Sequence, residues 1–244
     1  MSIRAVTFDY WNTLCRADVA TTSGRRRSAW HEVAASRFLP HEPAVLDAVL
    51  AHIAERHHEG WMANSQYTAE HALEEAFVLL GDLPDADRVA LADAWLDASR
   101  RANVQLTDGL ADVLAALDDC GVRIGIVCDV GLTPSVVLRE FLEQHGVLTH
   151  FDHWSFSDEV GVYKPAPAIF RHALDGLGVP DPRDALHVGD LRRTDVAGAR
   201  AAGMTAVRYR GVFDDPQDES VDIDGDHVID DLTELLTIVG VAVP

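Results

Sequence analysis

Residues 6–16 read VTFDYWNTLCR, and the prediction of the fold starts from these residues. An apolar run ends at Asp9, and Thr13 and Leu14 follow shortly after it. A short apolar run of this kind predicts a buried strand that carries an acid at its C-terminal end. The residue two positions after the acid is Trp11, where acid chemistry would use a second carboxylate.

Further short apolar runs follow along the chain, and most are followed by polar or acidic residues. Helical patterns separate several of these runs, and a glycine suited to a helix end closes them. Alternation of strand and helix predicts an α/β fold, a parallel sheet with helices on both faces. The predicted strands lie at residues 5–8, 123–128, 153–156, 185–188, 204–210 and 226–229, and the helical patterns at residues 110–121, 136–146, 168–178 and 195–203.

The segment between the first strand and the rest of the sheet has a different pattern. Residues 17–103 show long helical periodicities and few strand signals, with breaks near SRFLPHEP and GDLPDAD. We expect a helical cap domain inserted after the first strand. The predicted domains are therefore a core of residues 1–16 and 104–244 and a cap of residues 17–103.

Composition limits the partners and the compartment. The formal net charge is −20, from 40 acidic and 20 basic residues, which argues against nucleic acid and against an anionic membrane surface. A small anionic ligand would need local positive charge or a metal, and Lys164 is the only lysine. The three cysteines form no spaced framework, and we find no signal peptide and no long apolar run. We expect a cytoplasmic protein; the sequence carries no signal of its oligomeric state.

Acidic residues follow the predicted strands at the edge where α/β sheets bind ligands. Asp9, Asp190 and Asp195 are the informative set. Three carboxylates in one site repel each other unless a cation neutralises them, and an all-oxygen set suits Mg²⁺. Such a metal takes phosphate oxygens, so the set favours phosphoryl chemistry. In the alternative interpretation the acids only cap the following helices, as Asp195 could before VAGARAAG.

Four ordered motifs together resemble the haloacid dehalogenase superfamily of hydrolases. The first motif of that family, D-x-D-x-T-L after a strand, is similar to FDYWNTL at residues 8–14. The second motif aligns with IGIVCDVG, the third with VYKPAPAIF and the fourth with GDLRRTD. The agreement in order and spacing covers nearly the whole chain. It implies a Rossmann-like core, with the helical insertion where the family places its first type of cap.

The resemblance implies a role for each matching residue. Asp9 would attack phosphorus to form an aspartyl phosphate, which water then hydrolyses. Mg²⁺ would be held by Asp9, the backbone carbonyl of Trp11 and Asp190, with Asp195 contributing directly or through water. Lys164 would hold the nucleophile and a phosphate oxygen in place. The remaining candidates are Thr13 and Cys128 as catalytic residues and Trp11, Asn12, Asp129 and Arg16 as substrate-binding residues.

Two positions depart from the family pattern. Family phosphatases have a second Asp, which protonates the leaving oxygen, where this chain has Trp11. The indole has a donor N–H but no usable base, and general acid–base catalysis is typically worth ~10²–10⁴-fold. Cys128 replaces a Ser or Thr and is a weaker hydrogen-bond donor to phosphate. Trp11 would supply either a flat wall for a substrate or packing between core and cap.

These departures leave three functions open. The first is a Mg²⁺-dependent phosphatase of a small phosphorylated metabolite, which the acids of the fourth motif favour. The second is a metal-independent 2-haloacid dehalogenase, which would bind the substrate carboxylate through Arg16 or through an arginine of residues 25–27. The third is a binding protein that has lost turnover. The cap has no lysine, which argues against the carbon–phosphorus branch of the family. Asp129 and the cap histidines His31, His57 and His58 are candidates for the missing acid–base group.

Overall fold

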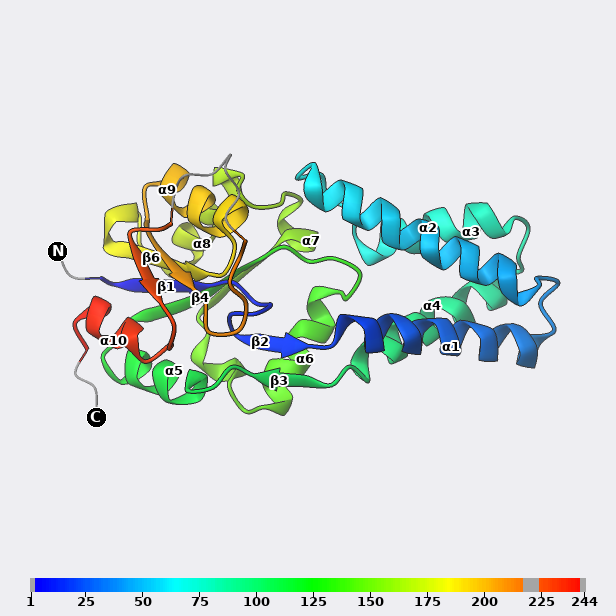
Figure 1. Cartoon of the computed structure of the whole chain (residues 1–244), viewed down its shortest axis with the longest axis horizontal. Helices are drawn as coiled ribbons and strands as arrows, with labels where there is room; N and C mark the ends of the chain where they lie inside the picture. The colour runs from blue at the N-terminus through cyan, green and yellow to red at the C-terminus, as the bar shows by residue number, and fades with distance from the viewer. Residues whose placement is uncertain (1–2, 217–223, 242–244) are drawn as a thin grey trace. The chain divides into compact units, whose positions relative to one another are not determined.

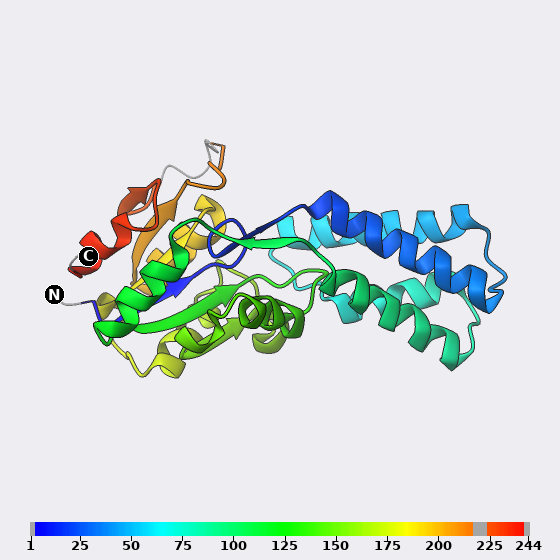
Figure 2. The same ribbon diagram turned by 90° about the horizontal axis from the view of Figure 1, so that it is seen from below.

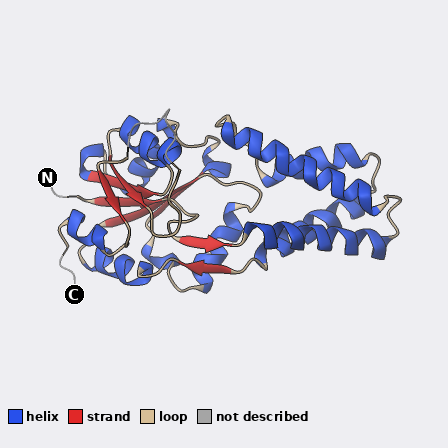
Figure 3. Cartoon of the chain, in the orientation of Figure 1, coloured by secondary structure: helices blue, strands red, loops and turns tan. Residues whose placement is uncertain are grey.

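The structure, a computed structural model, describes residues 3–216 and 224–241. The chain divides into two compact units, one built on a sheet and one on helices (Figure 3). The sheet unit comprises residues 1–16, 105–129 and 142–244. The helical unit comprises residues 17–104 and 130–141.

The sheet unit contains six parallel strands, which confirms the predicted α/β class (Figure 1). The strand order is β5-β4-β1-β6-β7-β8, so β1 lies between β4 and β6. All four of its residues are buried, as is typical of a central strand in a parallel sheet that helices cover on both faces. The strands are β1 (Ala5–Phe8), β4 (Arg123–Cys128), β5 (His153–Phe156), β6 (Ala185–Gly189), β7 (Thr205–Tyr209) and β8 (His227–Ile229).

Helices cover both faces of this sheet (Figure 1). On one face α8 (Pro167–Leu177) and α9 (Ala197–Ala202) pack against small and apolar strand residues such as Ala5 and Val127. On the other side lie α5 (Leu110–Asp119) and α10 (Glu234–Val239), which Figure 2 shows from below. The shorter elements are η1 (Leu148–His150), α7 (Ser157–Val160), η2 (Pro182–Asp184) and a π-helical turn, η3 (Arg192–Val196).

The helical unit has its own apolar core. Asp18 caps the first helix by accepting a hydrogen bond from the Thr21 backbone N–H, and Trp30 is fully buried and donates to the Leu91 carbonyl at 3.0 Å. Among the described residues no helix is long and apolar enough to cross a membrane. The helices are α1 (Val19–Arg37), α2 (Pro43–Met62), α3 (Ala69–Leu80) and α4 (Asp85–Arg100), and α6 (Ser135–Gln144) begins in this unit.

The helical unit extends beyond the predicted cap range. Residues 130–141 were expected in the core, but they group with the helices. Hydrogen bonds connect the loop before α6 to these helices. Leu132 accepts from Arg26 at 2.8 Å and from the Trp95 indole at 3.0 Å, and Thr133 accepts from Arg26 at 2.7 Å. Two short strands, β2 (Cys15–Ala17) and β3 (Val104–Leu106), pair with each other. The chain changes from one unit to the other within each of these strands.

Candidate active site

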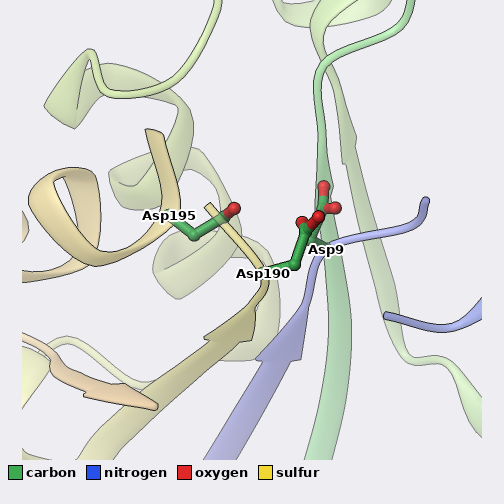
Figure 4. A group of neighbouring side chains, drawn as sticks. All are labelled: Asp9, Asp190 and Asp195. Carbon is green, nitrogen blue, oxygen red and sulfur yellow. The ribbon is translucent and has the colours of Figure 1, made fainter. Parts of the chain in front are cut away.

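Three buried carboxylates meet at the C-terminal edge of the sheet (Figure 4). Asp9 directly follows β1, Asp190 directly follows β6, and Asp195 lies in the π-helical turn before α9. One oxygen atom of each lies within 4.8 Å of those of the other two. Because the strands are parallel and adjacent, their ends deliver the first two acids side by side. The arrangement brings together the three acids selected from the sequence.

Lys164 bridges two of these acids. Its Nζ donates to Asp9 Oδ1 at 2.5 Å and to Asp195 Oδ1 at 2.6 Å, and the lysine is only 2% exposed. The Lys164 backbone N–H donates to Asp129 Oδ1 at 2.8 Å, which fixes the lysine's own backbone. Burial opposes the charged ammonium, but the Asp195 and Asp9 carboxylates raise the pKa of Lys164 well above its usual value. The lysine is therefore a permanent cation in the site.

One cation does not neutralise the three acids. Burial, together with the charges of Asp195 and Asp129, raises the pKa of Asp9 to about 7 despite the attraction of Lys164. Burial and the neighbouring acids also raise the pKa of Asp190 well above its usual value. For Asp195 burial acts in the same direction, but Lys164 and His187 outweigh it and lower the pKa. A divalent cation such as Mg²⁺ would favour the ionised carboxylates that burial and mutual repulsion disfavour, and the all-oxygen donor set fits such a cation.

The loop after β1 lies beside the acids and contacts one of them. The backbone N–H groups of Leu14 and Cys15 both donate to the Tyr10 carbonyl at 2.9 Å, which closes a tight turn. Asn12 lies in the left-handed region at φ 59°, and its Nδ2 donates to Asp190 Oδ2 at 3.1 Å. The Thr13 hydroxyl is buried and has no hydrogen-bond partner among the described residues. An unsatisfied buried hydroxyl at this position is available to a ligand.

Comparison with known proteins agrees with this geometry. The family model of the haloacid dehalogenase-like hydrolases matches residues 3–203. The chain belongs to this family. It is 34% identical over 161 residues to glyceraldehyde 3-phosphate phosphatase of Methanopyrus kandleri, which covers 66% of this chain and 67% of the relative. It is 35% identical over 157 residues to phosphoserine phosphatase of Thermus thermophilus, covering 63% and 59% of the two chains.

The fold of this haloacid dehalogenase-like hydrolase also matches solved structures over almost the whole chain. A 2-haloacid dehalogenase from Pseudomonas syringae pv. Tomato DC3000 superposes with a TM-score of 0.69, covers 98% of both chains and is 22% identical. At this identity the likeness concerns the fold alone. The family resemblance seen in the four motifs and the assignment to the hydrolases are confirmed.

Trp11 and Cys128 occupy the two positions that depart from the family pattern. Trp11 is half-buried, and its ring meets the Tyr10 ring edge-on with centroids 4.9 Å apart. Cys128 ends β4 and is fully buried, so burial raises the pKa of its thiol well above the usual value. The thiol therefore stays protonated and is a weak donor rather than a nucleophile.

Two predicted substrate-binding residues lie in different settings. Asp129 follows Cys128 and holds the Lys164 backbone, and burial raises the pKa of its carboxyl to about 6. Arg16 is exposed, and its Nη2 lies 3.9 Å from an oxygen of Asp108. The structure thus places Asp129 against the lysine and Arg16 beside an acid outside the group of three.

The cap residues considered as substitutes have partners in the helical unit. His31 pairs with Asp47 at 2.8 Å. The His57 ring packs against Gly131, where an added Cβ would lie 2.3 Å from Nε2, and His58 lies beside Trp61 with ring centroids 6.4 Å apart. Among residues 25–27, Arg25 donates to the Arg101 carbonyl, Arg26 to the loop before α6, and Arg27 to Asp47.

Sequence reasoning missed one buried residue beside the acids. His187 lies in the middle of β6, is 1% exposed, and places Nε2 3.1 Å from Asp195 Oδ1. A histidine inside an otherwise apolar strand is the signal that could have pointed to it. Its partner on the neighbouring strand, Thr7, has no such signal because threonine is common in strands.

Proposed function

We propose that the protein is a Mg²⁺-dependent phosphatase of a small phosphorylated metabolite. The observation that carries this proposal is Lys164 Nζ held between Asp9 and Asp195, next to Asp190. A carboxylate that is buried, oriented by a lysine and adjacent to two further acids is suited to attack phosphorus. The curated relatives described above are phosphatases, which supports the same chemistry.

Asp9 would act as the nucleophile in two displacements. In the first, an Asp9 oxygen forms a bond to phosphorus while the bond from phosphorus to the substrate oxygen breaks, and that oxygen leaves with a proton taken up from solvent. In the second, water attacks the aspartyl phosphate, which releases inorganic phosphate and restores the Asp9 carboxylate. Lys164 holds Asp9 and places positive charge next to the transferred group.

The metal would be held by carboxylate oxygens of Asp9 and Asp190 and by the Trp11 backbone carbonyl. When bound, it neutralises charge on the acids and on the phosphate. Asp195 differs from the other two because Lys164 and His187 already occupy its Oδ1. We therefore assign to Asp195 a contribution through water.

Trp11 would limit the range of leaving groups. The position carries no carboxylate to protonate the departing oxygen, so substrates whose leaving group needs little protonation would react fastest. The indole is half-buried, and in this proposal its flat apolar face would line the side of the site near the nucleophile. We assign to it a role in shape selection rather than in proton transfer.

A phosphate-release screen tests the function. The full chain is assayed against a panel of phosphorylated metabolites with Mg²⁺ and with a chelator, and Asp9→Asn is the control. Release that needs Mg²⁺ and is lost in the variant supports the phosphatase. Halide release from 2-haloacids that survives chelation would instead identify the protein as a metal-independent dehalogenase. Ligand binding without turnover across both panels would favour a binding protein.

We expect Mg²⁺ to stabilise the fold. A cation that binds only the folded state at about 100 times its dissociation constant adds about 2.7 kcal/mol to the free energy of unfolding. Thermal unfolding in MgCl₂ and in NaCl of equal ionic strength measures this effect. In Asp190→Asn the shift should fall sharply, and in Asp119→Asn, which changes an exposed acid at the end of α5, it should persist. Equal shifts in the two variants would contradict the metal site.

We expect Trp11→Asp to increase generic phosphatase activity. A carboxylate at this position could protonate the leaving oxygen and then activate water, which is typically worth ~10²–10⁴-fold. The comparison is with Trp11→Asn, which removes the indole without supplying an acid or a base. Steady-state rates on an alkyl phosphate, with Mg²⁺ binding checked for both variants, give the answer. A folded Trp11→Asp variant that binds the metal and gains no activity over Trp11→Asn would disprove this account of Trp11.

A further inference from the structure

Two buried polar residues lie directly behind the acids, on the sheet face that α8 covers. Thr7 in β1 and His187 in β6 are register partners on adjacent strands, and both are at most 1% exposed. The Thr7 hydroxyl lies 2.9 Å from His187 Nδ1. The opposite ring nitrogen, Nε2, lies 3.1 Å from Asp195 Oδ1. The Phe170 ring packs edge-on against the imidazole with centroids 5.1 Å apart, which restricts the ring orientation.

The contacts indicate which atoms carry the hydrogens between Thr7, His187 and Asp195. Asp195 Oδ1 accepts a hydrogen bond from Lys164 Nζ, so it is also the acceptor in the contact with His187, and His187 Nε2 is the donor. Nδ1, on the other side of the ring, lies 2.9 Å from the Thr7 hydroxyl, a group that can donate to it. The Thr7 hydroxyl is also within hydrogen-bond distance of the Leu186 carbonyl, at 3.3 Å, and we assign its hydrogen to the shorter contact with Nδ1. Thr7 selects the tautomer that Asp195 requires.

Both carboxylate oxygens of Asp195 accept hydrogen bonds. Its Oδ1 accepts from Lys164 Nζ and from His187, and its Oδ2 accepts from the Leu191 backbone N–H at 3.0 Å. Gly189 permits the close approach, because a Cβ there would lie 2.3 Å from Cγ of Asp195. The carboxylate therefore has a fixed plane, and that plane sets the direction from which Lys164 is held.

We propose that Thr7 and His187 are positioning residues of the phosphatase reaction: they orient Asp195, which in turn holds the Lys164 ammonium on the Asp9 nucleophile. The chain of contacts runs from Thr7 through His187, Asp195 and Lys164 to Asp9 without a gap. Both residues are buried, so we assign them no contact with substrate. This role rests on the proposed function, because it concerns the readiness of Asp9 to attack phosphorus. In this proposal two residues inside the sheet, Thr7 and His187, fix the orientation of Asp195.

Four variants of the full chain test the role. His187→Leu removes the Nε2 donor with little change of volume, and His187→Gln keeps a donor nitrogen at similar reach. Thr7→Val removes the hydroxyl without changing the side-chain shape, and Thr7→Ser retains it. Loss of a residue that orients a functional side chain typically costs about 10–100-fold in activity. We expect that loss in kcat for His187→Leu, a smaller loss for Thr7→Val, and KM values within about threefold of the wild type.

The conservative variants separate positioning from structure. His187→Gln and Thr7→Ser should recover most of the kcat that His187→Leu and Thr7→Val lose, with all four folded by circular dichroism and thermal unfolding. Wild-type kcat in a folded His187→Leu variant would overturn the proposal. Equal losses in Gln and Leu variants would overturn it as well. If His187→Leu fails to fold, the Thr7 pair decides in the same way.

A spectroscopic measurement keeps this test independent of turnover. In protein labelled with ¹⁵N-histidine, the His187 signals should show a neutral ring with hydrogen on Nε2, and Thr7→Val should shift the Nδ1 signal. A charged ring, or hydrogen on Nδ1, would overturn the assignment. If the wild type hydrolyses nothing on the panel while the His187 signals are as expected, the proposed function fails and the support of Asp195 stands.

Discussion

Asp9→Asn should abolish phosphate release while leaving the fold at least as stable as the wild type. The amide cannot attack phosphorus, and removal of a hydrolase nucleophile lowers kcat by roughly 10⁴-fold or more. Stability should not fall, because the wild-type carboxylate is buried beside Asp195 and its pKa is raised to about 7. Replacing it with a neutral group of the same shape relieves that repulsion, while Lys164 keeps its bond to Asp195.

Two measurements on one preparation check this result. Phosphate release is followed on the best substrate of the panel, and the free energy of unfolding is taken from denaturant titration without metal. Asp119→Asn, the exposed control, should change neither quantity. Turnover by Asp9→Asn within tenfold of the wild type would remove Asp9 from its assigned role. Loss of activity together with loss of fold would mean that the site contributes to stability in a way this charge balance does not describe.

Lys164→Met should have the largest effect on stability. The substitution keeps an apolar stem of similar length but leaves the Asp9 and Asp195 carboxylates buried without their cation. Breaking a buried pair by removing one partner typically costs about 3–5 kcal/mol. Activity should also be lost, because nothing then holds the nucleophile or balances the transferred phosphate. The comparison is with Arg183→Met, whose exposed ion pair with Asp181 should contribute little.

The penalty in Lys164→Met should grow with pH. Without the lysine, burial raises the pKa of Asp195 as it already raises that of Asp9, so the folded state holds protons that the unfolded state has lost. Stability then falls as pH rises from the unfolded pKa near 4 toward the folded values. Urea unfolding at pH 5 and pH 8 measures the difference between wild type and variant. A penalty that is equal at the two pH values would contradict the assignment of buried, titrating acids.

The positions of Asp9 and Asp190 could be predicted from the sequence because each residue directly follows an apolar run that forms a strand. Asp9 and Asp190 lie where parallel strands end, so local sequence was enough to bring them together. Lys164 stood out because it is the only lysine. The contribution of Asp195 could not be separated from helix capping until its contacts with Lys164 and His187 were known.

Other features depend on register and packing. Thr7 and His187 face one another only because β1 and β6 pair in one register, and no pattern in either strand specifies it. The assignment of residues 130–141 to the helical unit depends on Arg26 and Trp95, which are far from that loop in sequence. Such contacts between distant segments are set by tertiary packing, which periodicity does not report.

The division at residue 130 bears on how this protein could be recombined. The helical unit is formed by two separate stretches, residues 17–104 and 130–141. It therefore cannot be exchanged between homologues as one continuous segment. A graft that replaces only the first stretch would leave Leu132 without Trp95 and Arg26, its hydrogen-bond donors in this chain. Homologous helical units should therefore transfer intact only when the loop before α6 is exchanged with them.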